Sequence, residues 1–185
     1  MKKFLSLLLC AVFSFGFCAC GDSDIDPDKY VGEAQMTRFK ALFTTELDLY
    51  SDVFALSTLD ADKAKSFDYK GEEWAPVKSA SYSSYKKLSE VVGAAFTSEA
   101  AEKLLKEYDF YADIDGKFCI KTGSIKKSDS DKPELDISKQ PKLVSSSADD
   151  CVIRYNVKVG KLNKSVNVRF VKQNGSYKLS EFVNI

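Results

Sequence analysis

The spacing of apolar residues changes once along this chain, near residue 109, and that change constrains the fold more than any other feature. Before it, apolar side chains recur every three to four residues, the period of an amphipathic helix. After it, they alternate with polar side chains, the period of a strand. Helices followed by strands are typical of an α+β domain, in which helices cover one face of an antiparallel sheet.

Three helices are predicted in the first part of the domain. Their apolar stripes cover residues 30–56, 82–96 and 97–108. Thr97 is suited to cap the third helix, and the helix dipole favours Glu99 in its first turn. A shorter helical turn is expected over residues 60–67, before Gly71 and Pro76 interrupt the pattern.

The second part of the domain is predicted to be a sheet. Asp115 and Gly116 favour a two-residue turn that closes a hairpin of residues 110–114 and 117–122. Further strands are expected over residues 143–159, 166–172 and 177–183. Between Cys151 and Val159 the odd-numbered residues are apolar or aromatic, whereas residues 154, 156 and 158 are polar. This alternation indicates a sheet with one face exposed to solvent. The fold prediction is therefore three N-terminal helices packed on a curved antiparallel sheet of about five strands.

Residues 123–141 form a long connection in a domain whose other predicted connections between strands are short turns. The segment contains Lys, Ser, Asp and two prolines with few apolar residues, so we expect a solvent-exposed loop of unusual length. Long loops held by a rigid scaffold often carry function. The loop is therefore predicted to belong to a contact surface.

Residues 1–19 have the composition of a cleavable signal peptide. Lys2 and Lys3 precede an apolar run over residues 4–17. A run of about 14 residues is too short for a transmembrane helix, which needs roughly 20. We therefore expect secretion rather than a retained membrane span.

The end of this segment, Phe-Cys-Ala-Cys-Gly at residues 17–21, resembles the bacterial lipobox. Phe17 stands where leucine is usual, and Cys18 stands where serine, alanine or threonine is usual. The resemblance implies cleavage before Cys20 and lipidation of Cys20, which would attach the chain to a membrane outside the cytoplasm. Ordinary secretion with cleavage near Ala19 is the alternative interpretation.

The domain organisation follows from these patterns. Residues 1–19 are the signal peptide, residues 20–29 an acidic flexible tether, and residues 30–185 a single α+β domain. The tether carries four Asp and one Pro, and it also resembles the surface-export signals of some bacterial lipoproteins. Lys+Arg and Asp+Glu both number 27, which removes the electrostatic argument for nucleic-acid binding.

The sequence contains no motif for catalysis, and no catalytic residue, metal ligand or cofactor site is predicted. The chain has no histidine, which excludes triads and metal sites that depend on imidazole. Cys119 and Cys151 lack metal-ligand spacing. Alternation places Cys151 with apolar residues and Cys119 with Lys117 and Lys121, which favours two separate thiols over a disulfide.

Asp113, Asp115 and Gly116 suggest a calcium-binding loop. The first required carboxylate would fall at Tyr111 and the twelfth-position glutamate at Thr122, so the motif fails at its main ligands. Turn chemistry explains these residues better.

Two further groups of residues have alternative explanations. Asp109 with Tyr111 or Tyr155 would be the place to look for acid–base chemistry, but tyrosines in a small domain more often pack in the core. Trp74 is either an exposed ligand platform or, more simply, a lid over the open end of the helices.

Three short motifs carry a resemblance to known families: FTSEA at residues 96–100, DGKF at 115–118 and NGSYKL at 174–179. With the order of elements over residues 32–185, they resemble the nuclear-transport-factor-2-like superfamily and the secreted DL-endopeptidase inhibitor family of bacteria. The first resemblance implies a cystatin-like, cone-shaped fold with a pocket between sheet and helices. Family membership alone does not determine function.

Two classes of function are consistent with the sequence. The first is a noncatalytic interaction module at the cell envelope that regulates cell-wall hydrolases, as the inhibitor family implies. The alternative is a carrier or enzyme that uses the cone pocket for a small molecule. The expected partners are a membrane, through the N-terminal lipid, and an envelope protein or a small apolar ligand.

Overall fold

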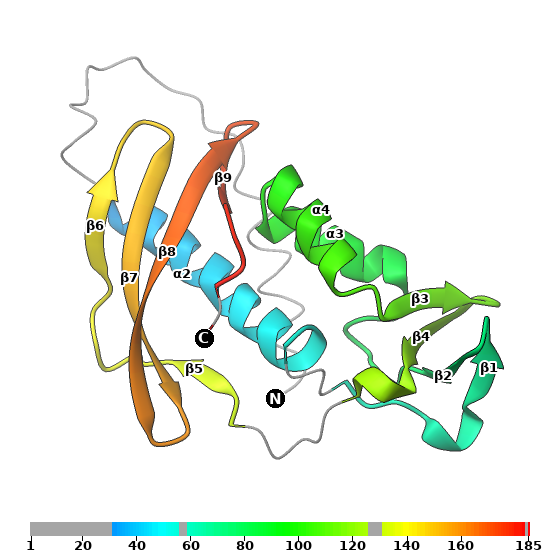
Figure 1. The fold of residues 1–185 in the computed structure, drawn as a ribbon. Helices are drawn as coiled ribbons and strands as arrows, with labels where there is room; N and C mark the ends of the chain where they lie inside the picture. Colours follow the sequence, from blue (N-terminus) through cyan, green and yellow to red (C-terminus); the bar gives the residue numbers. More distant parts are fainter. Residues whose placement is uncertain (1–30, 56–58, 126–130, 184) are drawn as a thin grey trace.

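The computed structural model describes residues 31–55, 59–125, 131–183 and 185 (Figure 1). The predicted signal peptide, Cys20 and the tether lie outside the described residues. The elements, in chain order, are α2 (Glu33–Asp48), the π-helix η1 (Leu49–Val53), the 3-10 helix η2 (Lys63–Lys65), β1 (Phe67–Tyr69), β2 (Glu72–Pro76), α3 (Tyr85–Ala95), α4 (Ser98–Glu107), β3 (Tyr111–Ile114), β4 (Lys117–Lys121), the 3-10 helix η3 (Thr122–Ser124), β5 (Pro133–Leu135), β6 (Lys142–Ser146), β7 (Asp150–Val159), β8 (Leu162–Gln173) and β9 (Ser176–Leu179).

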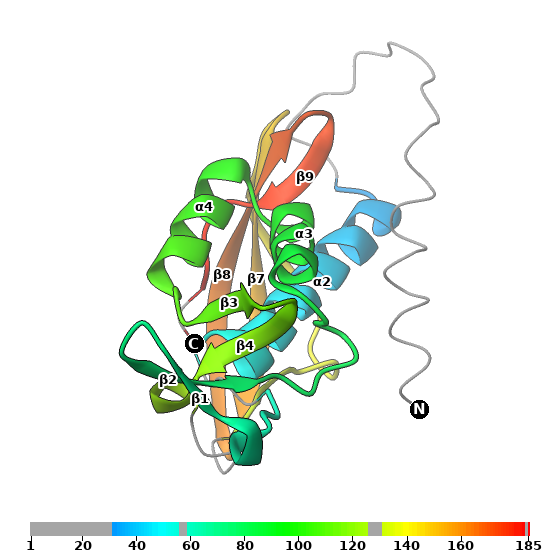
Figure 2. The same cartoon turned by 90° about the vertical axis from the view of Figure 1, so that its right-hand side faces the viewer.

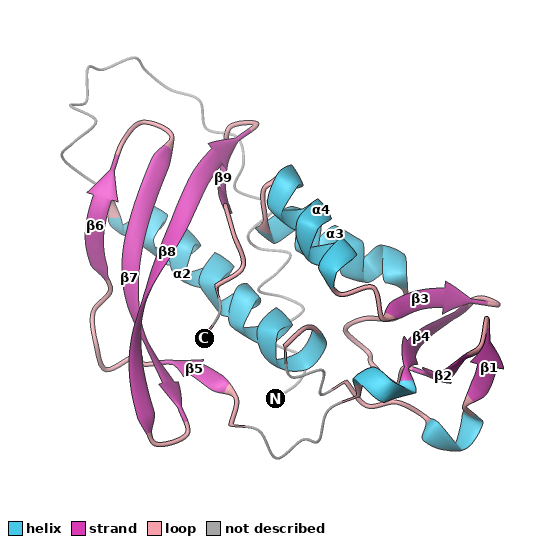
Figure 3. Cartoon of the chain, in the orientation of Figure 1, coloured by secondary structure: helices cyan, strands magenta, loops and turns pink. Residues whose placement is uncertain are grey.

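The strands form two antiparallel sheets, coloured magenta in Figure 3. One has four strands in the order β1-β2-β4-β3, and the other has the order β5-β7-β8-β9 with β6 also paired to β7. The α+β class and the three helices are confirmed, but the single sheet of about five strands is wrong. The hairpin predicted over residues 110–122 pairs with β2, where Ala75 lies opposite Ile120, rather than with the C-terminal strands.

The two sheets lie on opposite sides of the molecule. In Figure 1 the five-stranded sheet is on the left and the four-stranded sheet at the lower right, with α3 and α4 between them. Figure 2, viewed from the right-hand side of Figure 1, shows the four-stranded sheet in front of β7 and β8. Because β1 and β2 follow α2 in the chain, the helices do not all precede the strands.

Local chemistry explains where the helices begin and end. The Ser84 hydroxyl caps α3 by accepting the Lys87 N–H at 3.0 Å, and the Thr97 hydroxyl caps α4 by accepting the Ala100 N–H at 3.3 Å. The cap predicted at Thr97 is thus confirmed. The first helix ends at residue 53, as the π-helical turn of η1, rather than at residue 56.

The predicted hairpin turns are also present. Asp115 and Gly116 have φ of 49° and 73°, the left-handed conformation that a type I′ turn requires, and Asn174-Gly175 has the same geometry. A third such turn at Lys70-Gly71 closes the β1–β2 hairpin. The short helical turn predicted within residues 60–67 is present as η2, and Phe67, the last residue of that range, already belongs to β1.

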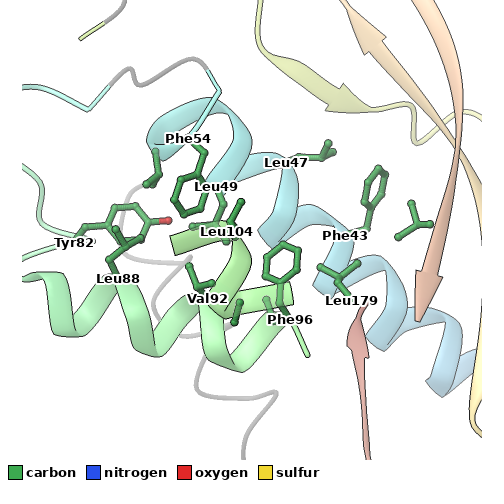
Figure 4. Close-up of a cluster of buried hydrophobic side chains, with 14 of the residues drawn as sticks. Phe43, Leu47, Leu49, Phe54, Tyr82, Leu88, Val92, Phe96, Leu104 and Leu179 are labelled. Carbon is green, nitrogen blue, oxygen red and sulfur yellow. The ribbon is translucent and has the colours of Figure 1, made fainter. Parts of the chain in front are cut away.

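The main core fills the space between α2 and the five-stranded sheet. The rings of Phe43 and Tyr155 stack at 4.7 Å between centroids, and those of Phe39 and Phe170 stack at 4.3 Å. Figure 4 shows Phe43 and Leu47 facing the strands at one end of the cluster, and side chains of η1, α3 and α4 at the other. The alternation predicted for β7 is confirmed, because Cys151, Ile153, Tyr155 and Val157 are buried.

Among the described residues, no helix combines the length and apolar character needed to cross a membrane.

Candidate functional site

The structure does not bring together the residues proposed for acid–base chemistry. The Asp109 side chain is 77% exposed. Tyr111, on β3, donates its hydroxyl to the carbonyl of Val53 at 2.9 Å. Tyr155 lies in the other sheet, where burial raises the pKa of its phenol. These groups therefore serve packing and local hydrogen bonding rather than a shared reaction centre.

The two cysteines are free thiols on different sheets. Cys151 faces the main core as predicted, whereas Cys119 is fully buried and packs with Trp74 and Ile114. The prediction that Cys119 shares a face of β4 with Lys121 is confirmed, since both side chains lie beside Trp74, and the two cysteines remain separate thiols. Burial raises the pKa of both thiols, that of Cys151 to about 11, which keeps them protonated and unreactive at neutral pH.

The acidic residues of the β3–β4 hairpin have structural roles. A carboxylate oxygen of Asp113 accepts the backbone N–H of Tyr85 at 2.8 Å and so ties β3 to the first residue of α3. Asp115 and Gly116 form the tight turn. The turn predicted at Asp115 and Gly116 is therefore confirmed.

Trp74 is neither an exposed platform nor a lid over the helices. It lies on β2 in the four-stranded sheet, it is 5% exposed, and its neighbours form a small cluster separate from the main core. The sequence could not indicate this position, because β1 and β2 were not predicted as strands.

The segment 123–141 is more ordered than an exposed loop. Residues 126–130 lie outside the described residues, but β5 pairs with β7, with Pro133 opposite Val159 and Leu135 opposite Val157. Pro133 is buried. The prediction of an irregular, solvent-exposed segment is therefore wrong for residues 133–135.

Asp136 organises the turn that follows β5. This buried carboxylate accepts the Ser138 hydroxyl at 2.6 Å, the Ser138 N–H at 3.1 Å and the Lys158 ammonium at 3.2 Å, all through Oδ1. These donors, Ser138 first, hold the pKa of Asp136 below its ordinary value. The turn is thus fixed to β7 by the charged side chain of Asp136, which accepts from Lys158 on that strand.

Ile137 sits on this turn and is 79% exposed. Leu143 and Val144 on β6 are also exposed apolar residues. Because β8 occupies one side of β7, β5 and β6 both pair along its other side. We call residues 133–146 the β5–β6 edge. Its backbone is hydrogen-bonded to β7, and Ile137, Leu143 and Val144 are its exposed apolar side chains.

Sequence reasoning missed both Asp136 and Ile137 as individual residues. One signal was available, because an aspartate whose side chain accepts the N–H two residues further on is typical of an Asx turn. Residues 136–138, Asp-Ile-Ser, begin with such an aspartate, so the sequence allows an Asx turn at this position.

The sequence matches the family described as IseA DL-endopeptidase inhibitor over residues 37–184. The chain belongs to this family. The resemblance drawn from the three short motifs is thereby confirmed for the inhibitor family. No curated protein gave a match. The matched segment includes both sheets, α3, α4 and the whole β5–β6 edge.

Proposed function

We propose that this protein is a lipid-anchored inhibitor at the cell envelope, which binds a DL-endopeptidase through its β5–β6 edge and does not itself catalyse a reaction. The family match over residues 37–184 carries the inhibitory role, since DL-endopeptidases are cell-wall hydrolases. The exposed side chain of Ile137 on a fixed turn supports the choice of surface.

The β5–β6 edge is suited to binding because the turn that carries Ile137 is already ordered before a partner binds. An apolar side chain that a partner buries contributes roughly 1.5–3 kcal/mol, and the gain is largest when little conformational entropy is lost on binding. The Asp136 hydrogen bonds already order the turn that presents Ile137. Lys132 supports the other end of β5 through an ion pair with Asp52 at 2.6 Å.

The alternative function, a carrier or enzyme that uses a cone pocket, has less support. The space between α2 and the five-stranded sheet, where such a pocket would lie, is filled by the Phe43–Tyr155 and Phe39–Phe170 pairs. A filled core leaves binding through the outer surface as the simpler explanation.

Membrane attachment is the part of the proposal that rests on residues 1–20 alone. The lipobox-like segment supports lipidation at Cys20, and the acidic tether would place the domain away from the membrane surface. Such an inhibitor would act on hydrolases within reach of its tether.

The experiment measures hydrolysis of purified cell walls by a purified DL-endopeptidase as inhibitor concentration is increased. Ile137→Ser should raise the concentration needed for half-inhibition by roughly 10-fold or more, the equivalent of losing about 1.5–3 kcal/mol of apolar burial. Leu162→Ser is the matched control, because Leu162 is an apolar residue 64% exposed on β8. It should leave inhibition unchanged.

Two results would contradict the proposal. If the unaltered protein does not slow hydrolysis, the inhibitory function is wrong for this chain. If it inhibits and both variants inhibit equally well, the function stands but the β5–β6 edge is not the contact surface. Point substitutions are preferable to replacing residues 126–140 by a linker, since that replacement would also remove β5 and Asp136.

A further inference from the structure

Two positively charged side chains lie directly opposite each other on the outer face of the five-stranded sheet. Lys142 on β6 pairs in register with Arg154 on β7, and both residues are exposed. Like charges directly opposite each other on neighbouring strands repel and lower the stability of a sheet. The fold therefore carries an unfavourable pair at this position, and a negatively charged partner would relieve it.

No carboxylate among the described residues neutralises this pair. The Nε of Arg154 donates to Oδ1 of Asn167 on β8 at 2.9 Å, so an uncharged neighbour holds the guanidinium in place. Neither Arg154 nor Lys142 forms an ion pair with another described residue. Asp150, at the beginning of β7, is already paired with Arg169. The positive charge of the pair is thus free to act on a partner.

The acidic residues at the other end of β7 are too distant to compensate it. Asp136 accepts the Lys158 ammonium at 3.2 Å, and Glu134 lies opposite Lys158 in the strand register. Lys158 is four positions along β7 from Arg154, which corresponds to about 13 Å at roughly 3.3 Å per residue. This separation exceeds the Debye length of about 8 Å at physiological ionic strength.

The pair borders the apolar part of the β5–β6 edge. Ile137, the most exposed apolar side chain of this edge, lies five residues before Lys142, and the exposed Lys139 lies between them. Leu143, directly after Lys142, is also exposed. Exposed apolar side chains next to uncompensated positive charge fit an acidic area on a folded protein. A polyanionic polymer would match the charge but would bury none of the apolar side chains.

We propose that Lys142 and Arg154 guide the β5–β6 edge onto an acidic area of the DL-endopeptidase surface, an inference that rests on the inhibitory function proposed above. Carboxylates of the enzyme bind the two cations, and the side chain of Ile137 is buried beside them. Long-range attraction of this kind acts mainly on the association rate, whereas apolar burial acts mainly on the dissociation rate. The two contributions can therefore be measured separately.

Charge reversal at Lys142 tests this role. Lys142→Glu places a carboxylate opposite Arg154 and so replaces a repulsive pair by an attractive one. The melting temperature of the free protein should rise by about 1–4 °C, as measured by calorimetry. The variant should nevertheless associate with a purified DL-endopeptidase about tenfold more slowly at low ionic strength, as measured by biolayer interferometry. Raising the ionic strength from about 0.01 M to about 1 M shortens the Debye length from about 30 Å to about 3 Å and should remove this difference.

Lys103→Glu is the matched control, because it makes the same change in net charge at an exposed lysine of α4. In Figure 1, α4 lies beyond β9, which β7 and β8 separate from β6. Lys103→Glu should leave the association rate within about twofold of the unaltered protein and should not raise the melting temperature. Ile137→Ser should have the opposite kinetic effect to Lys142→Glu, with dissociation about tenfold faster and association nearly unchanged.

Failure of this inference and failure of the proposed function give different results. An unaltered protein that neither binds nor inhibits the enzyme contradicts the inhibitory function, and the inference falls with it. If the unaltered protein inhibits but Lys142→Glu and Lys103→Glu associate equally fast, only the acidic partner surface is contradicted. Faster association of Lys142→Glu would mean that the enzyme surface is basic. Weaker cosedimentation of Lys142→Glu with purified cell walls, with enzyme association unchanged, would assign the two cations to a wall polymer instead.

Discussion

Glu46 should make the stability of this protein fall as the pH rises. The residue lies on α2, fully buried, where its Oε1 accepts the backbone N–H of Val183. Its Oε2 is buried without a hydrogen-bond partner among the described residues. Burial is the main cause that raises the pKa of Glu46 from 4.5 to about 8, with a smaller contribution from the charge of Glu181.

The sign of the effect follows from proton binding. Below pH 4.5 the carboxyl is protonated in both the folded and the unfolded chain, and it contributes no pH dependence. Between pH 4.5 and about 8 the unfolded chain has lost this proton while the folded chain keeps it, so stability decreases with rising pH. At about 1.36 kcal/mol per pKa unit, the loss is roughly 5 kcal/mol once the pH exceeds 8.

Glu46→Gln isolates this effect, because the amide stays neutral and its oxygen can still accept the Val183 N–H. We expect the two proteins to have similar free energies of unfolding at pH 4, and the variant to be more stable by several kcal/mol at pH 9. Urea denaturation followed by circular dichroism at five pH values between 4 and 9 measures the difference. Glu102→Gln, at an exposed position on α4, is the control and should parallel the unaltered protein.

The reasoning fails if the curves for Glu46→Gln and the unaltered protein stay parallel across this range. Parallel curves would mean that the folded protein hydrates or otherwise neutralises the Glu46 carboxylate. Other groups that titrate, such as Asp48, whose pKa burial raises to about 6, are common to both proteins and cancel in the difference.

Two further predictions concern the membrane anchor and the core. Cys20→Ala should abolish incorporation of labelled fatty acid and leave uncleaved or freely secreted protein, so unchanged labelling would contradict lipidation at Cys20. Phe43→Ala should lower the free energy of unfolding by about 3–5 kcal/mol and Val157→Ala by about 1–3 kcal/mol, since both side chains are fully buried. Urea melts that show no loss would mean that α2 does not pack on β7.

The sequence predicts well those elements that are determined by residues close together in the chain. The α4 cap depends on Thr97 and a residue three positions away, and the turns at Asp115-Gly116 and Asn174-Gly175 depend on two adjacent residues. The apolar stripe of α2 and the alternation of β7 each lie within one element. None of these features requires knowledge of a distant partner.

The assignment of strands to sheets depends on contacts between distant residues. β1 and β5 have three residues each, too few to show a period, and β2 ends in proline. The burial of Cys119 follows from its contact with Trp74, about 45 residues earlier in the chain, and the hairpin sequence carries no sign of it.

The two buried carboxylates show why residue type and burial do not suffice to predict charge. Asp136 has three donors at one oxygen, and the pKa of its carboxyl is lowered, whereas Glu46 has one backbone donor, and its pKa is raised. The contribution of Asp136 to stability is therefore present above its ordinary pKa of 3.8 and is lost as the pH falls through the lowered value. The contribution of Glu46 changes in the opposite direction, over pH 4.5 to about 8. Near pH 4.5 both contributions are present, because the Asp136 carboxylate is ionised and holds the β5–β6 edge while the Glu46 carboxyl still carries its proton.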